Sequence, residues 1–248
     1  MIYFIGAGPG AKDLITIRGM HLLQAANLVI YAGSLVNPEL LDYCRPDCIR
    51  MNSARMTLED VLAAIQARPS DETIVRLHTG DPSLYSAIRE QMDALDQLHM
   101  PYEIVPGVSS MSAAAAALHA EYTLPSVSQT VIISRMAGRT AVPQKEQIRS
   151  LAAHGSTMVL FLSAGMLRDL CQELIVGGYP EDTPAAVVYK ASWPDEEIIQ
   201  GTLNDLPDKA SHISKTALVL VGGFLSGTYS RSRLYDPAFT HGFREGIR

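Results

Sequence analysis

The sequence is poor in cysteine, and the few cysteines it has follow no metal or redox motif. Cys44, Cys48 and Cys171 form no C-x-x-C pair, and their odd number argues against a framework of disulfide bonds. The histidines show no metal-ligand spacing either. These shortages exclude a disulfide-stabilised secreted scaffold, and they predict a protein of the reducing cytoplasm that holds no metal of its own.

Long apolar runs and an excess of basic charge are also missing. Nowhere do apolar residues continue far enough to span a bilayer, and residues 2–5 already read as a strand, without the features of a signal peptide. The formal net charge of −6 gives a field that repels nucleic acid and acidic membrane surfaces. We therefore expect a soluble protein in which an anionic substrate is met by locally placed arginine or lysine.

The chain has enough apolar residues to build two domains of the α/β class. Its 248 residues are 47% hydrophobic, which suffices to fill a core. The first half alternates strand-like and helix-like segments, as expected for a mainly parallel sheet. In the second half, the connection between segments 185–190 and 197–201 is too short for a parallel crossover, so these two should pair antiparallel. We predict an N-terminal domain at 1–121, a C-terminal domain with a mixed sheet at 126–230, and a surface tail at 231–248.

Individual elements follow from local patterns. A helix is predicted behind the N-cap Thr57, because apolar residues recur at helical spacing through 58–65. A second helix should open at Asp81-Pro82 and run to Leu98, and a third should lie near 164–176. The predicted strands are 2–5, 28–31, 73–77, 102–105, 130–134, 157–161, 185–190, 197–201 and 217–221.

A glycine-rich turn follows the first predicted strand. Residues 6–11, Gly-Ala-Gly-Pro-Gly-Ala, satisfy the G-x-G-x-x-G/A pattern of dinucleotide-binding folds. That pattern also requires an acidic residue about 20 positions later, and 29–31 ends without one. Pro9 moreover removes a backbone N–H that a pyrophosphate would need. We interpret the segment as a tight turn on which a ligand lies flat, and a purely structural turn is the alternative.

Two further turns follow neighbouring predicted strands. In the first, Gly80 permits close approach of a ligand, and Asp81 can either accept hydrogen bonds from that ligand or merely cap the next helix. In the second, Pro106-Gly107 leads to Ser109-Ser110. Because the carboxyl ends of parallel strands meet at one edge of a sheet, the two turns together predict a pocket there.

In this order and spacing, the motifs resemble those of the tetrapyrrole methylases, over essentially the whole chain. The resemblance implies two α/β domains with a trough between them for S-adenosylmethionine, which leaves as S-adenosylhomocysteine. Further segments resemble the branch that acts on corrin precursors, which implies methylation at C11 of an anionic tetrapyrrole in cobalamin biosynthesis. The family motifs are residues 6–10 with 13–16, 31–34, 79–82 and 106–110. The branch segments are 31–36, 128–132 with Arg135 and 138–140, and 234–241.

The resemblance also implies cofactor contacts from both domains and, by the same analogy, a homodimer. One of these positions, Ala191, stands where several relatives have glycine. No catalytic base can be named from the residues. The implied contacts are Pro9, Thr79, Gly80, Asp81, Leu84, Ser109 and Ser110 from the first domain, and Leu162, Ala186, Ala191, Thr216 and Ala217 from the second.

The carboxylates of such a substrate need cationic partners. Arg135 and Arg139 flank a glycine-containing loop in the second domain, and a guanidinium group binds a carboxylate in a bidentate manner. We predict that these two arginines bind the substrate, and solvated surface arginines are the alternative.

Three other functions remain open at this stage. The first is a methyltransferase of the same fold acting at another precorrin position or on ribosomal RNA, although the negative charge argues against RNA. The second is an NAD-dependent oxidoreductase, which the missing acidic residue disfavours. The third is a non-catalytic protein that binds S-adenosylmethionine as a sensor.

Overall fold

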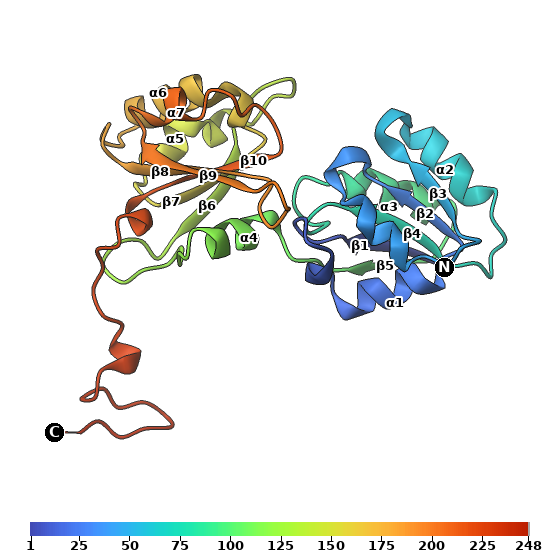
Figure 1. Cartoon of the computed structure of the whole chain (residues 1–248), viewed down its shortest axis with the longest axis horizontal. Coiled ribbons are helices and arrows are strands. Elements are labelled where there is room, and N and C mark those ends of the chain that lie inside the picture. The colour runs from blue at the N-terminus through green and yellow to red at the C-terminus, as the bar shows by residue number, and fades with distance from the viewer. Residues whose placement is uncertain (248) are drawn as a thin grey trace. The chain divides into compact units, whose positions relative to one another are not determined.

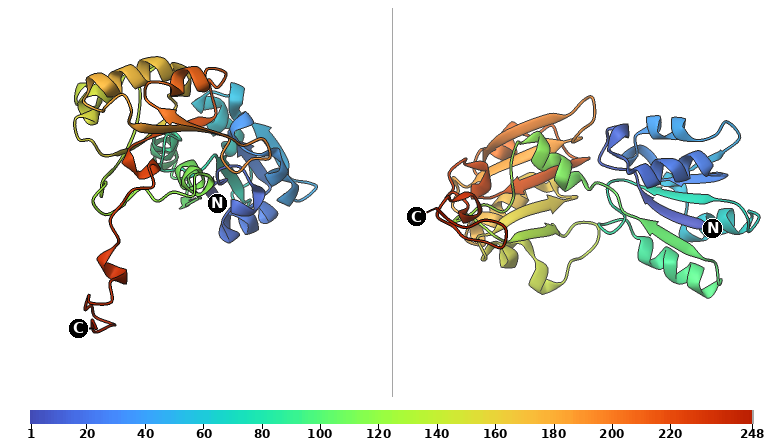
Figure 2. Two further views of the ribbon diagram at one scale, coloured as in Figure 1. Left: turned by 60° about the vertical axis from the view of Figure 1, so that its left-hand side comes forward. Right: turned by 90° about the horizontal axis from the view of Figure 1, so that it is seen from below.

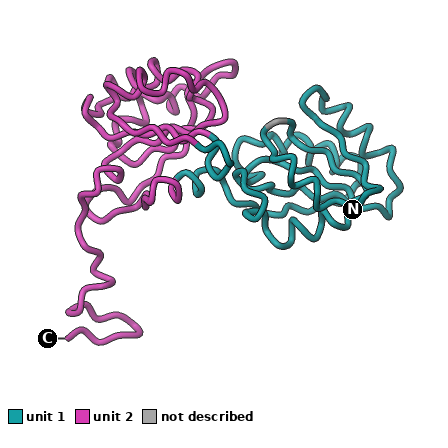
Figure 3. Tube along the Cα trace, in the orientation of Figure 1, with its two compact units in different colours: residues 1–114, 190–196 teal, residues 115–189, 197–248 magenta. Residues whose placement is uncertain are grey.

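The computed structural model describes residues 1–247, apart from the side chain of Ser34 (Figures 1 and 2). The chain divides into two units (Figure 3). Each unit has its own five-stranded sheet. Unit 1 comprises residues 1–114 and 190–196, and unit 2 comprises 115–189 and 197–248. The boundaries predicted from the sequence stay predictions, and the last residue of the predicted tail lies outside the described residues.

Unit 1 holds a fully parallel sheet in the order β3-β2-β4-β1-β5. Four of its strands were predicted from their apolar runs, and β3 was missed. The side chains of β3 are mostly exposed at the edge of the sheet, so it lacks the apolar signal of a buried strand. The strands are β1 (Ile2–Gly6), β2 (Leu28–Tyr31), β3 (Ile49–Asn52), β4 (Ile74–His78) and β5 (Tyr102–Val105).

Helices cover both faces of this sheet (Figure 1). Helix α1 (Ile17–Ala25) packs on one face together with the 3-10 helix η3 (Pro38–Tyr43). Helices α2 (Leu58–Gln66) and α3 (Ile88–Gln97) pack on the other. The predicted cap of α2 is confirmed, because Thr57 and Asp60 form a reciprocal capping box.

The predicted helix start at Asp81-Pro82 is wrong, since α3 begins only at Ile88. Asp81 instead closes a turn by accepting a hydrogen bond from the Ser83 backbone N–H at 2.9 Å. Tyr85 and Ala87 then adopt left-handed backbone angles, with φ of 55° and 48°. A right-handed helix cannot continue through such residues.

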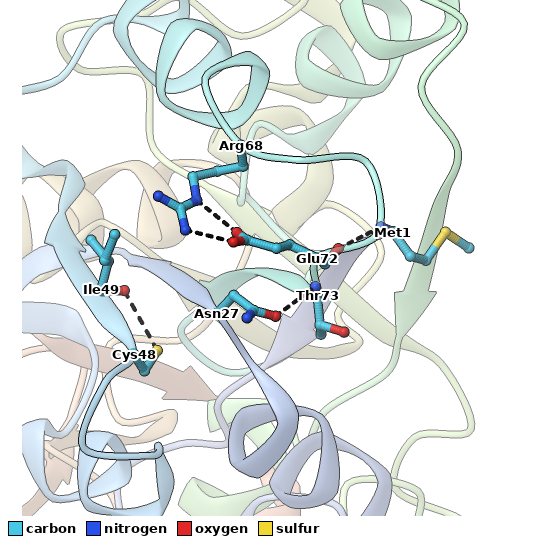
Figure 4. Close-up of polar contacts among 7 residues, drawn as sticks. All are labelled: Met1, Asn27, Cys48, Ile49, Arg68, Glu72 and Thr73. Carbon is cyan, nitrogen blue, oxygen red and sulfur yellow. Dashed lines mark hydrogen bonds and ion pairs between the residues drawn. The ribbon is translucent and has the colours of Figure 1, made fainter.

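Polar contacts hold the edge at which the strands of unit 1 begin (Figure 4). The Met1 amino group donates to the Glu72 carbonyl at 2.7 Å, and the Thr73 N–H donates to Asn27 Oδ1 at 3.0 Å. Arg68 and Glu72 form a bidentate ion pair beside them. This edge is therefore structural, and the opposite edge, where the strands end, carries the predicted site motifs.

Unit 2 holds a mixed sheet in the order β6-β7-β10-β8-β9, as predicted. β6 and β7 are parallel, and the other neighbours, including β8 with β9, pair antiparallel. Helices α5 (Ile148–Ala152), α6 (Leu167–Val176) and α7 (Leu206–Lys209) pack on one face (Figures 1 and 2). The strands are β6 (Val131–Arg135), β7 (Thr157–Phe161), β8 (Pro184–Tyr189), β9 (Glu197–Thr202) and β10 (Ala217–Val221).

The remaining helices are short or connect the two halves. Helix α4 (Ser110–Ala117) follows β5 and is rich in alanine, which favours a helix. No helix within the described part of the chain has the length and apolar character needed to cross a membrane. The other 3-10 helices are η1 (Lys12–Leu14), η2 (Gly33–Leu35), η4 (Ser53–Arg55), η5 (Gln144–Glu146), η6 (Ala164–Met166), η7 (Gly223–Leu225) and η8 (Arg233–Tyr235).

Candidate functional site

Three loops cross in close contact where β1, β4 and β5 end, an edge that we call the carboxyl edge of unit 1. A Cβ atom on Gly107 would lie 2.3 Å from the Gly80 carbonyl oxygen, and one on Gly6 would lie 2.5 Å from the Gly107 Cα. Real Cβ atoms do not approach this closely, so only glycine fits at Gly6 and Gly107. Glycine is therefore required at these two positions because backbone atoms of the neighbouring loops lie against them.

Asp81 ties two of these loops together. One carboxylate oxygen accepts the Gly107 backbone N–H at 2.8 Å, and the other accepts both the N–H and the hydroxyl of Ser83. Partial burial opposes its ionisation, but these hydrogen bonds outweigh it and hold the pKa of Asp81 below its ordinary value. The residue therefore braces the loops as a carboxylate and does not cap a helix.

Most backbone N–H groups of the turn at residues 6–11 donate hydrogen bonds within the protein. The N–H groups of Ala7 and Gly8 donate to the carbonyls of His78 and Gly80, and that of Ala11 donates to Ser192 Oγ. On the acceptor side, the Gly10 carbonyl receives the Asn37 amide at 2.9 Å. A pyrophosphate site needs several N–H groups that point at the ligand. The committed donors of this turn do not suit one, which weighs against NAD.

The structure gathers most of the predicted cofactor residues at the carboxyl edge of unit 1. Ala191 was expected on the strand 185–190 of the second domain, and this is corrected. It lies beyond β8, is almost fully buried, and belongs to the loop 190–196 of unit 1. Gathered here are Pro9, Thr79, Gly80, Asp81, Leu84, Ser109, Ser110 and Ala191, and the hydroxyl-bearing members are all partly exposed.

The same loop contributes two residues that sequence reasoning missed, Ser192 and Trp193. The Trp193 indole N–H donates to the Pro9 carbonyl at 2.9 Å, across a separation of 184 residues. No local sequence pattern predicts a contact between segments so far apart. The available signal was that the only tryptophan of the chain stands two positions after Ala191.

In unit 2, the predicted residues separate into an edge group and one interior residue. Leu162 follows β7, and Thr216 and Ala217 stand where the antiparallel β10 begins, so these three share one edge. Leu162 and Thr216 are both left-handed, with φ of 56° and 55°. The register pairs Ala186 with Leu220, inside the sheet, and its side chain is fully buried. The structure therefore does not bring Ala186 to the edge.

The two predicted substrate arginines differ in their surroundings. The Arg135 guanidinium donates to the carbonyls of Met136, Thr140 and Ala141 at 3.3, 3.2 and 2.8 Å. It thereby orders the loop that carries Arg139. The Arg139 side chain is exposed, so of the two it is the one presented to solvent for a carboxylate.

His78, which adjoins a site motif, lies in the core between the sheet and α3. It is 4% exposed beside the buried Arg76, whose guanidinium donates to Gln91 Oε1 and the Ile30 carbonyl. Burial, and then the charge of Arg76, lower the pKa of His78 to about 3. Among the described residues its Nε2 has no hydrogen-bond partner. At neutral pH His78 is thus an uncharged core residue.

This burial predicts acid sensitivity. The unfolded imidazole takes up a proton near pH 6.5, whereas the folded one stays neutral until about pH 3, so stability falls as the pH drops between these values. Between pH 7 and pH 5 the loss is about 2 kcal/mol. In His78→Leu, urea unfolding at pH 7 and pH 5 should no longer show this loss in the free energy of unfolding. Replacing the exposed His154 by leucine should leave it in place, and an unchanged loss in His78→Leu would contradict the assignment.

Comparisons with known proteins identify the family of the chain. The family model of the tetrapyrrole (corrin/porphyrin) methylases matches residues 1–207. The cobalt-precorrin-4 C(11)-methyltransferase of Methanocaldococcus jannaschii is 50% identical over 98% of this chain and 96% of its own length. The precorrin-4 C(11)-methyltransferase of a Sinorhizobium species is 42% identical over 98% of both chains.

A solved structure supports the same assignment at the level of the fold. It is that of a cobalamin biosynthetic enzyme, cobalt precorrin-4 methyltransferase, and it superposes with a TM-score of 0.88 at 46% identity. The match covers 90% of this chain and 95% of the other. One conclusion follows from the two-sheet fold, from the carboxyl edge with its closely packed glycines, and from these matches: the chain belongs to the tetrapyrrole methylases.

Proposed function

We propose that the chain is an S-adenosylmethionine-dependent methyltransferase that methylates C11 of a corrin precursor, cobalt-precorrin-4 or precorrin-4, in cobalamin biosynthesis. The observation that carries this proposal is the 50% identity over nearly the full length of a relative with that activity in its name. A relative whose name carries no cobalt is 42% identical over an equal share of the chain, so both acceptors belong in the test. A homodimer is expected from the family analogy and a cytoplasmic location from the scarcity of cysteine, and both stay predictions.

The residues at the carboxyl edge of unit 1 fit this cofactor. S-Adenosylmethionine carries no phosphate, so it does not require the backbone N–H groups that the turn 6–11 has already committed. Thr79, Ser109 and Ser110 are partly exposed at this edge, and their hydroxyls can donate to its polar groups. When bound, the cofactor supplies an electrophilic methyl group on a sulfonium.

The contribution of the chain itself is orientation. Asp81 fixes the loops after β4 and β5 against each other, so the hydroxyls at this edge keep a constant geometry. Holding two reactants in attack geometry supplies roughly 7–11 kcal/mol of a barrier at best. Methyl transfer of this kind requires no nucleophile from the protein, and no catalytic base could be named from the sequence.

Isothermal titration calorimetry tests the cofactor. We expect S-adenosylhomocysteine to bind the purified protein with an occupancy of one per chain, and NAD to give no heat of binding. Binding of NAD, or of neither ligand, would contradict the proposal.

Arg139 is expected to bind a carboxylate of the corrin precursor. Because a hydrogen bond to a charged group contributes about 1.5–3 kcal/mol, Arg139→Ala should raise the KM for the acceptor at least about tenfold. Arg139→Lys keeps the charge without the bidentate geometry, so its KM for the acceptor should lie between those of the wild type and Arg139→Ala. The dissociation constant of S-adenosylhomocysteine should be the same in all three proteins. An unchanged acceptor KM in Arg139→Ala would show that this arginine is merely solvated.

A further inference from the structure

The loop 190–196 lies between two strands of unit 2, yet it packs within unit 1 against the turn 6–11. We propose that Trp193 is a positioning residue, which holds this turn in the conformation that binds the cofactor. The inference rests on the proposed function, because it concerns the same cofactor. It adds a residue that neither the sequence motifs nor the family resemblance assigned to the site.

Two hydrogen bonds from the loop bracket Gly10. On one side the Trp193 indole N–H donates to the Pro9 carbonyl at 2.9 Å, and on the other Ser192 Oγ accepts the Ala11 N–H at 3.0 Å. The position of the turn is therefore fixed on both sides by residues from the other half of the chain.

The indole ring also explains why residue 10 is glycine. A Cβ atom on Gly10 would lie 2.1 Å from Cδ1 and 2.3 Å from Nε1 of Trp193. Any larger residue at position 10 would have to displace the ring. Gly10 has no left-handed backbone angle, so its conformation does not demand glycine. The small residue makes room for the indole.

Contacts within the loop itself, which we call the clamp, order it. Lys190 forms an ion pair with Asp195 at 2.5 Å, and its ammonium group lies 5.2 Å from the centre of the indole ring. The Ser192 N–H donates to Glu196 Oε2 at 2.6 Å. Lys190 and Ser192 both adopt left-handed angles, with φ of 46° and 69°. Such strained residues persist only where their surroundings hold them, and they cluster at functional sites.

The clamp connects two predicted cofactor contacts that are far apart in the sequence. Pro9 provides the carbonyl that the indole holds, and Ala191 stands in the clamping loop itself. A loss of the indole N–H should therefore loosen the turn and the loop together. The expected consequence is weaker binding of the cofactor, with the chemistry of an already bound cofactor little changed.

The test measures S-adenosylhomocysteine binding by calorimetry in Trp193→Phe, Trp193→Ala, Gly10→Ala and the double variant Gly10→Ala/Trp193→Ala. Trp193→Phe keeps a ring against Gly10 but loses the donor, and its dissociation constant should rise about 3- to 10-fold. Trp193→Ala loses both contacts and should bind more weakly still. In the methyl transfer assay the KM for S-adenosylmethionine should rise in both variants, with kcat little changed.

The double variant separates a clamp from a ligand contact. If Gly10 is small to admit the indole, the loss of affinity caused by Gly10→Ala should be at least about tenfold smaller in the Trp193→Ala background. If Gly10 is small to admit the cofactor, the loss will be the same in both backgrounds, and the inference is overturned. Tyr102→Phe is the matched control. Tyr102 lies at the start of β5, and the substitution removes only its hydroxyl contact to Asp96, so this variant should bind the ligand like the wild type.

The single tryptophan provides an independent readout. Its fluorescence in the wild type should change in a saturable manner with S-adenosylhomocysteine, at the concentrations seen by calorimetry. If the wild type does not bind this ligand, the proposed function fails. If the wild type binds it and the Trp193 variants bind it equally well, only the inference about Trp193 fails.

Discussion

Replacing Gly107 by alanine is expected to destabilise unit 1 and to abolish measurable binding of S-adenosylhomocysteine. The new methyl group would lie 2.3 Å from the Gly80 carbonyl oxygen and 2.7 Å from the Gly6 Cα, both of which are backbone atoms. Backbone cannot rotate away as a side chain can, so the loops after β1, β4 and β5 must separate. Overpacking of this kind costs about 1–3 kcal/mol, and more where the neighbours are fixed. Urea unfolding and calorimetry measure the two effects.

Gly242 provides the control for this substitution. A Cβ atom there would meet no other atom within 4 Å, and its backbone angle is not left-handed. Gly242→Ala should therefore match the wild type in stability and in ligand binding. A Gly107→Ala protein of wild-type stability and affinity would show that the three loops are not in the close contact described.

Replacing Asp81 by alanine is expected to weaken S-adenosylhomocysteine binding about tenfold or more and to lower the free energy of unfolding by about 2 kcal/mol. The variant loses the hydrogen bond to the Gly107 N–H together with those to Ser83, so the loops after β4 and β5 are no longer tied. Asp81→Asn retains the size and one acceptor but loses the charge, and it should fall between alanine and the wild type.

The pH dependence of stability tests whether the ionised carboxylate of Asp81 is the form that stabilises the fold. Its folded pKa lies below the ordinary value, so its contribution is present above the unfolded pKa of about 3.9 and is lost as the pH falls through the folded value. The stability difference between the wild type and Asp81→Ala should therefore be constant near neutrality and shrink in acid below about pH 4. A difference that does not change with pH would assign the effect to packing.

Local patterns in the sequence were sufficient for most of the fold. The buried strands of both sheets carry apolar runs, and the capping box at Thr57 marks the start of α2. The edge strand β3 was missed because exposed side chains leave no apolar run. The start of α3 was misplaced because Asp81-Pro82 is a good helix start, whereas here Asp81 is committed to the turn and to Gly107.

The candidate site was predictable where the chain repeats a motif and not where distant segments meet. The loops after β1, β4 and β5 were found because each follows a predicted strand. Trp193 was missed because its contact with Pro9 joins segments 184 residues apart. The prediction that Arg135 binds substrate rested on its residue type. Its hydrogen bonds to the loop carbonyls depend on a backbone path that no spacing in the sequence reveals.

The most direct test of the account is a methyl transfer assay with methyl-labelled S-adenosylmethionine, in which cobalt-precorrin-4 and precorrin-4 are supplied in separate reactions. We predict that one labelled methyl group appears at C11 of at least one acceptor by carbon NMR, with one equivalent of S-adenosylhomocysteine formed. A label at another carbon would place the enzyme elsewhere among the tetrapyrrole methylases. If S-adenosylhomocysteine binds but neither acceptor is methylated, the proposed reaction is contradicted.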